Sequence, residues 1–140
     1  MRNLILSLTV AGSIVGLAAV ASSGRSAAAD EGGFKPVANP EILMENVGEA
    51  FDAVKDRIKE KDTKKLKKAK KEALFLAELL NVAGYYKGEK DWREWATKCR
   101  DLAKKLSDDC DQGDVKSLQE QYKALEAACE VCHKKYRDDK

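Results

Sequence analysis

The sequence predicts an all-α protein, an antiparallel four-helix bundle. Three observations lead to this fold class. Apolar residues recur at spacings of three and four along most of the chain, which is the pattern of amphipathic helices. No segment alternates with a period of two, so no strand is predicted. Four helical segments of about twenty residues are joined by short connections, and helices connected in this way pack most simply as antiparallel neighbours.

The first helix is predicted to start at Pro40, directly after Asn39. Asparagine is a favourable N-cap because its side-chain oxygen accepts a hydrogen bond from an N–H of the first turn. Proline suits the first helical position because the N–H that it lacks would have no partner inside the helix. The apolar stripe of this helix consists of Met44, Val47, Phe51, Val54 and Ile58.

The second helix is predicted to follow Asp62 and to end at Gly84. Lysines fill much of the segment 64–71, but apolar residues interrupt them at helical spacing. The simplest interpretation is a solvated lysine face on an amphipathic helix, and the alternative is a docking patch for an acidic redox partner. The apolar stripe consists of Leu66, Ala69, Ala73, Leu76, Leu80 and Ala83.

The third helix is predicted after a turn over residues 85–90 and is expected to stop before Gly113. Its apolar stripe consists of Trp92, Trp95, Cys99, Leu102 and Leu106. The fourth helix is predicted to start at Asp114. Its stripe consists of Val115, Leu118, Tyr122, Leu125, Cys129, Cys132 and Tyr136.

The N-terminal stretch has the layout of a secretory signal peptide. A short positive start precedes an apolar segment from Leu4 to Val20, and small alanines come before Asp30. We therefore expect residues 1–29 to be removed on export to the periplasm, leaving residues 30–39 as a polar arm and residues 40–140 as the bundle domain. A permanent anchor is the alternative, but the apolar segment is short for a spanning helix. The mature form is accordingly expected to have no membrane association.

The length, the charge balance and the single histidine of the chain limit the functions that it can have. The chain has 140 residues, which suits a single domain. Residues 1–29 contain Arg2 and Arg25 and no acid, so their removal lowers the 26 basic residues to 24, equal to the 24 acidic ones. A chain without net charge is not expected to bind nucleic acid. The single histidine, His133, must serve in any chemistry that needs one.

The segment Cys129-Glu130-Val131-Cys132-His133 is the motif that carries chemistry. The pattern C-x-x-C-H is a known signature of c-type haem attachment. Residues three and four apart share a face of a helix, so both cysteines and the histidine project from nearly one side. Two thiols can then bond the two vinyl groups of one haem while the imidazole reaches its iron. The motif predicts one haem c per chain, held by Cys129 and Cys132, with His133 as an iron ligand.

Three other interpretations of the cysteines fit the sequence less well. A thioredoxin-like C-x-x-C lies near a βαβ unit, whereas this one lies late in an all-helical chain. A structural zinc site could include Cys99 and Cys110, but their spacings to each other and to Cys129, eleven and nineteen residues, differ from those of fingers and ribbons. Plain disulfides are the third alternative, because export leads to an oxidising compartment.

Residues 113–137 resemble the C-terminal helix of the class II cytochromes c, which are the cytochrome c′ family and its low-spin relatives. Members are exported four-helix bundles with C-x-x-C-H near the C-terminus, often followed by an aromatic residue and an arginine, here Tyr136-Arg137. Trp92 or Trp95 stands where members often carry a tryptophan that opens the third helix. The resemblance covers the mature chain in helix count and order. It implies a haem inside the bundle, with His133 as the fifth iron ligand.

The resemblance also implies a residue for the sixth coordination position. In the family this residue comes from the first helix, and it is either a bulky apolar group that leaves the iron five-coordinate or a methionine that ligates it. Met44 is the only methionine after residue 29, and the segment 44–48 resembles the family's Met-x-x-x-Gly stretch. We expect Met44 to ligate the iron, and core packing is the alternative. Many members carry an arginine one turn earlier, where this chain has Pro40.

Cys99 and Cys110 allow two interpretations. In a continuous helix their Cα atoms lie about 16 Å apart, since each residue rises about 1.5 Å. A disulfide needs less than about 7 Å. A Cys99–Cys110 bridge therefore requires the helix to break near Ser107, and two buried free thiols are the alternative.

Together these observations predict an exported electron carrier rather than an enzyme. Its iron is expected to cycle between the ferric and ferrous states and to exchange electrons with redox partner proteins. The alternative is a five-coordinate protein that binds nitric oxide or carbon monoxide. The sequence leaves open whether two bundles associate as a homodimer.

Overall fold

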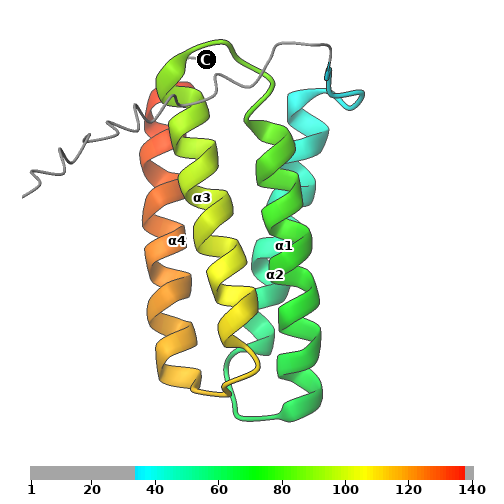
Figure 1. Ribbon diagram of the computed structural model, residues 1–140, viewed down its shortest axis with the longest axis vertical. Coiled ribbons are helices and arrows are strands. Elements are labelled where there is room, and N and C mark those ends of the chain that lie inside the picture. Colours follow the sequence, from blue (N-terminus) through cyan, green and yellow to red (C-terminus); the bar gives the residue numbers. More distant parts are fainter. Residues whose placement is uncertain (1–33, 138–140) are drawn as a thin grey trace, which may run out of the picture. The chain divides into compact units, whose positions relative to one another are not determined.

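The computed structural model describes residues 34–137, which form four α-helices and no strand. The helices are α1 (Pro40–Arg57), α2 (Thr63–Ala83), α3 (Lys90–Asp109) and α4 (Val115–Tyr136). Consecutive helices run in opposite directions (Figure 1). The predicted all-α four-helix bundle is therefore confirmed. The predicted signal peptide, residues 1–29, lies outside the described residues.

The helix ends follow from local chemistry. Asn39 caps α1 as predicted, its side chain accepting a hydrogen bond from the Ile42 N–H at 2.8 Å. Asp62 caps α2 and Asp114 caps α4 in the same way. Each aspartate side chain accepts a hydrogen bond from the backbone N–H of the residue three positions later. These hydrogen bonds satisfy N–H groups that have no partner inside the helix. Gly113 has φ +69°, a conformation that favours glycine, and this residue turns the chain from α3 into α4.

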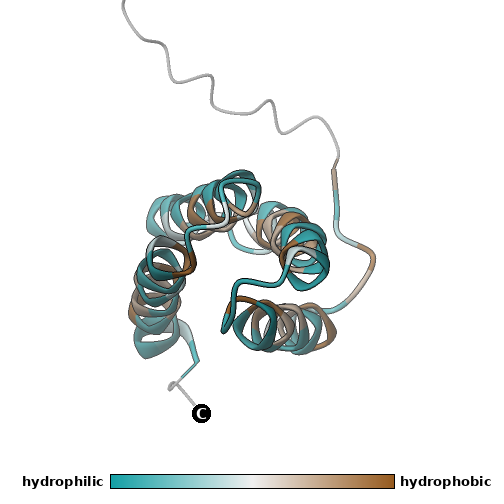
Figure 2. Cartoon of the chain, turned by 90° about the horizontal axis from the view of Figure 1, so that it is seen from below, coloured by the Kyte–Doolittle hydropathy of each residue, from teal (hydrophilic) through white to brown (hydrophobic). Residues whose placement is uncertain are grey.

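The helices lie on an arc, with α1 and α4 at its two ends. Seen end-on, the order around the arc is α1, α2, α3 and α4 (Figure 2). The closely packed pairs are α1 with α2, α2 with α3, and α3 with α4. Because α1 and α4 pack less closely than these pairs, the two helices that carry the predicted iron ligands face one another across the open side of the bundle.

Two clusters of buried side chains make up the core. The turn-end cluster lies toward the α1–α2 and α3–α4 turns and consists of Val54, Ile58, Leu66, Ala69, Ala73, Leu106, Cys110, Leu118 and Tyr122. The site-end cluster consists of Val47, Ala50, Leu76, Ala77, Leu80, Cys99, Ala103, Leu125 and Ala128. Most members belong to the predicted stripes. Leu43 near the start of α1 is also buried, although it does not belong to the predicted stripe.

Some residues of the predicted stripes are only half-buried. They are Met44, Phe51, Trp95, Leu102, Val115, Cys129, Cys132 and Tyr136. All except Leu102 and Val115 line one pocket at the end of the bundle where α4 finishes. The pocket therefore explains the incomplete burial of these six residues, and the predicted helical register is not at fault.

The Cys99–Cys110 disulfide is not formed. The helix α3 is continuous from Lys90 to Asp109, so it does not break near Ser107 as a bridge would require. The two thiols are buried and free, and they belong to different core clusters. Burial raises the pKa of Cys110 to about 11. Within residues 34–137 we also find no helix that is long and apolar enough to cross a membrane.

Leu118→Ala is expected to lower the free energy of unfolding by about 2–5 kcal/mol, the usual cost of truncating a buried leucine. Leu118 is completely buried in the turn-end cluster, so its truncation leaves a cavity among the surrounding core residues. Leu74→Ala is the matched control, because Leu74 is 48% exposed on α2 and its truncation leaves no cavity. Urea unfolding of both variants measures the difference. Equal costs for the two variants would contradict the core described here.

Candidate functional site

A pocket of about 620 Å³ lies at the end of the bundle where α1 begins and α4 ends. Its volume falls within the range of about 300–1,000 Å³ that is typical of small-molecule and cofactor sites. All four helices contribute to its wall, and the contributions of α1, α2 and α3 are mainly apolar. These apolar residues include Met44, Val47, Phe51, Leu80, Ala83, Trp92, Trp95 and Ala96.

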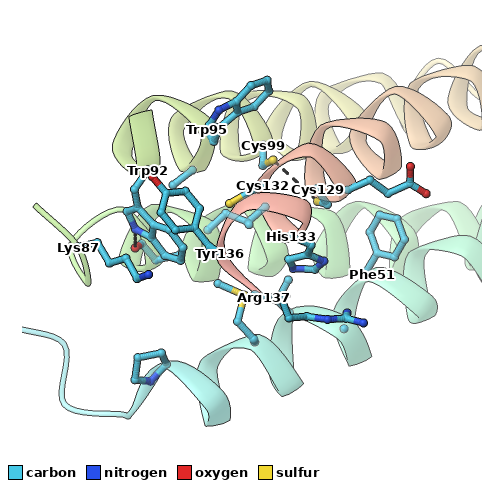
Figure 3. A pocket seen from close by; sticks show the side chains of 18 of the residues that line it. Phe51, Lys87, Trp92, Trp95, Cys99, Cys129, Cys132, His133, Tyr136 and Arg137 are labelled. Carbon is cyan, nitrogen blue, oxygen red and sulfur yellow. Dashed lines mark hydrogen bonds between the residues drawn. The ribbon is translucent and has the colours of Figure 1, made fainter. Parts of the chain in front are cut away.

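The C-x-x-C-H motif forms the α4 side of this pocket. Cys129, Cys132 and His133 all line it from the last turns of α4, as their spacing on one helix face predicts. Each of the three is half-buried. Figure 3 shows the histidine on the side of α4 that faces α1, with Phe51 and Arg137 nearby.

Met44 lines the same pocket from the second turn of α1. The structure therefore brings together all four residues that were predicted as cofactor ligands, although Met44 and the motif lie far apart in the sequence. Met44 is half-buried, so its thioether is neither fixed in the core nor fully solvated. Gly48, one turn further along α1, also lines the pocket. A Cβ at Gly48 would meet no atom within 4 Å, so the wall is open at this point.

Cys99 of α3 is part of the site as well. Its Sγ atom lies 3.8 Å from Sγ of Cys129, within hydrogen-bond distance for two thiols (Figure 3). The hydrogen bond with Cys129 and burial raise the pKa of Cys99 well above its ordinary value. The pKa of Cys129 is lowered, because the Cys99 thiol stabilises its thiolate. Cys129 is therefore the more acidic thiol of the pair.

The sequence did not predict this thiol pair. Cys99 and Cys129 both lie on inward stripes of consecutive antiparallel helices, which is a signal that they could meet. The stripes do not give the register between the helices, however, and the register decides which residues come into contact.

An aromatic and charged cluster lies at one edge of the pocket, which Trp92 and Tyr136 line. The rings of Trp92 and Tyr136 meet edge to face with centroids 4.9 Å apart. Nε1 of Trp92 donates a hydrogen bond to the Ala83 carbonyl oxygen at 2.8 Å, which ties α3 to the end of α2. The Tyr136 hydroxyl donates to Oδ1 of Asp91 at 2.7 Å, and Lys135 forms an ion pair with the same carboxylate. These contacts join α4 to the start of α3.

Asp91→Asn is expected to remove a pH-dependent contribution to stability. Hydrogen bonds from Lys135 and Tyr136 lower the pKa of Asp91 from 3.8 to about 2. A carboxylate whose pKa is depressed by folding stabilises the folded state above its unfolded pKa, and this stabilisation is lost as the pH falls through the folded pKa. The wild-type protein should thus have the higher Tm near neutral pH, and the difference should vanish toward pH 2. Thermal unfolding across this range measures it; a difference that stays constant would contradict the assignment.

Among residues 34–137, no three His, Cys, Asp or Glu side chains are grouped so that they could hold a metal ion by themselves. The cluster of protein ligands that the zinc interpretation requires is therefore not formed in this part of the chain. Comparison of the chain with protein-family models, with curated protein sequences and with solved structures gives no match in any of the three.

Proposed function

We propose that this chain is an exported monohaem c-type cytochrome that transfers single electrons, with His133 and Met44 as iron ligands. The observation that carries the proposal is the position of the C-x-x-C-H motif. Its three functional side chains line a pocket of about 620 Å³, and the only methionine of the described residues lines the same pocket from the opposite helix.

The residues present fit a haem. A porphyrin is large, flat and apolar, and the pocket is walled by aliphatic and aromatic side chains from three helices. Both cysteines of the motif line the pocket and are half-buried. Gly48 lines the pocket and is exposed, and no atom lies within 4 Å of the position a Cβ would take there, so the pocket is not crowded at this point of α1. The donor set of two thiols, an imidazole and a thioether is that of a c-type cytochrome.

Each residue has a distinct role in this proposal. A haem supplies an iron that gains and loses one electron without the making or breaking of bonds in a substrate. Cys129 and Cys132 would hold the haem through two thioether bonds, each the product of adding one S–H to one vinyl group. His133, which lines the pocket from α4, would bind the iron through its imidazole. The apolar wall excludes water, and a low-polarity surrounding together with a thioether ligand raises the reduction potential.

Two structural features support electron transfer, and the first of them also favours it over gas binding. Met44 lines the pocket from α1 and His133 lines it from α4, so a thioether and an imidazole would both be available to the iron. The pocket also reaches the surface at exposed residues such as Glu41 and Lys87, so one edge of a bound cofactor would lie close to a docked redox protein. We propose partner redox proteins in the periplasm, consistent with the predicted export.

Absorption spectra of the purified protein in the ferric and ferrous forms test the proposal. We expect low-spin spectra, a ferric charge-transfer band of the kind that sulfur ligation produces, and reversible one-electron reduction. The intact mass should be that of a chain that starts at Asp30, as the predicted removal of residues 1–29 requires. A high-spin ferrous form that binds carbon monoxide rapidly would favour the five-coordinate alternative, and a colourless protein would contradict both.

A further inference from the structure

The contact between Cys99 and Cys129 joins α3 to α4 beside the pocket. The Sγ atoms lie 3.8 Å apart, and both residues line the pocket wall. Cys99 is 2% exposed within the site-end cluster, whereas Cys129 is half-buried. The two side chains already face one another across packed helices, and a disulfide would bring the sulfur atoms from 3.8 Å to a bond length of about 2.05 Å.

We propose that Cys99 and Cys129 form an inter-helix disulfide in the haem-free chain, and that this disulfide withholds Cys129 from haem attachment until it is reduced. The consequence for attachment rests on the proposed function. The disulfide itself depends only on the two thiols and their positions.

The bond forms by thiol–disulfide exchange with the disulfide of a protein oxidant or of oxidised glutathione. The more accessible Cys129 attacks one sulfur of the oxidant, whose S–S bond breaks and releases one thiol. Cys99 then attacks the sulfur of Cys129 in the mixed disulfide and releases the second thiol. Two electrons pass from the cysteines to the oxidant, and their two protons go to the released thiols. A dithiol reductant reverses both steps.

The geometry favours Cys99 over the other thiols as the partner of Cys129. Cys132 lies three residues further along the continuous helix α4, and Figure 3 shows its sulfur pointing away from Cys129. A Cys129–Cys132 bond would require both side chains to turn toward each other. Cys110 lies in the turn-end cluster, about 16 Å along α3 from Cys99 by helical rise. It cannot reach the pair without unfolding.

Peptide mapping of the full-length haem-free chain tests the disulfide. The chain is treated with the thiol oxidant diamide, free thiols are alkylated, and the protein is digested with trypsin. Cleavage after Lys98, Arg100, Lys123 and Lys134 places Cys99 on residues 99–100 and both motif cysteines on residues 124–134. We expect these two peptides to be linked, with one alkylated thiol in the larger one, and the link to persist in Cys132→Ser. A Cys129–Cys132 bond, links to Cys110, or full alkylation would overturn the proposal.

The effect on attachment is tested in the Cys132→Ser background, where Cys129 is the only motif thiol. Diamide-treated Cys132→Ser, cleared of oxidant and given ferrous haem, should lose covalent haem uptake and regain it after a dithiol reductant. Additional Cys99→Ser should abolish this loss, whereas additional Cys110→Ser, the matched buried control, should not. Uptake by oxidised Cys132→Ser would overturn the withholding step. If the peptide link forms but no reduced variant, including the wild type, takes up haem, the disulfide stands and the cytochrome function fails.

Discussion

The combined substitution of Cys129→Ala and Cys132→Ala is expected to abolish covalent haem attachment and to give a colourless chain. Each single substitution should remove one of the two thioether bonds. Without haem the pocket of about 620 Å³ is left without its apolar filling. We therefore expect the double variant also to unfold at a lower temperature than the loaded wild type, because a bound group that favours the folded state stabilises it.

The control for this experiment is Cys110→Ala. Cys110 is a buried cysteine in the turn-end cluster and does not line the pocket. Its substitution should leave the haem content unchanged. Haem staining after denaturing electrophoresis separates the variants. Retention of covalent haem by the double variant would show that the motif thiols are not the attachment points.

Met44→Ala is expected to convert a low-spin protein into a high-spin one and to create a site for carbon monoxide. The substitution removes a ligand and side-chain volume, so its stability cost should approach the value of about 2–5 kcal/mol for a buried Met→Ala change. Met44→Leu is the matched variant. It keeps nearly the same volume, so it should cost less than about 1.5 kcal/mol while changing the spin state just as fully.

The spin state decides between ligation and packing. If Met44 only packs against the cofactor, Met44→Leu should leave both the spectrum and the stability almost unchanged. Absorption spectra with and without carbon monoxide, recorded beside thermal unfolding, distinguish the two roles.

Most of the fold could be predicted because the helices are specified locally. Asn39 and Pro40 determine where α1 starts through hydrogen bonding that depends on only a few residues. The apolar stripe of α2 is buried over its whole length, since this helix lies within the arc with a closely packed neighbour on each side. The burial of Leu43 was not predicted, because the width of the buried face depends on how neighbouring helices pack.

The candidate site was predictable only in part. The one-sided placement of Cys129, Cys132 and His133 follows from helical periodicity alone. The contact of Cys99 with Cys129 and that of Tyr136 with Asp91 depend on the register between α3 and α4. That register results from packing of the complete cores and is not encoded in any one segment. Met44 was proposed from a resemblance, and its position in the pocket wall agrees with the proposed role.

The most direct test of the central claim is acid–acetone extraction of the unaltered protein, followed by mass spectrometry of the chain. Thioether bonds survive this treatment, whereas non-covalently bound haem is removed. The proposed function predicts that the colour stays with the protein and that the peptide 124–134 carries one haem. Extraction of all the colour, or a chain whose mass includes no haem, would contradict covalent attachment through Cys129 and Cys132.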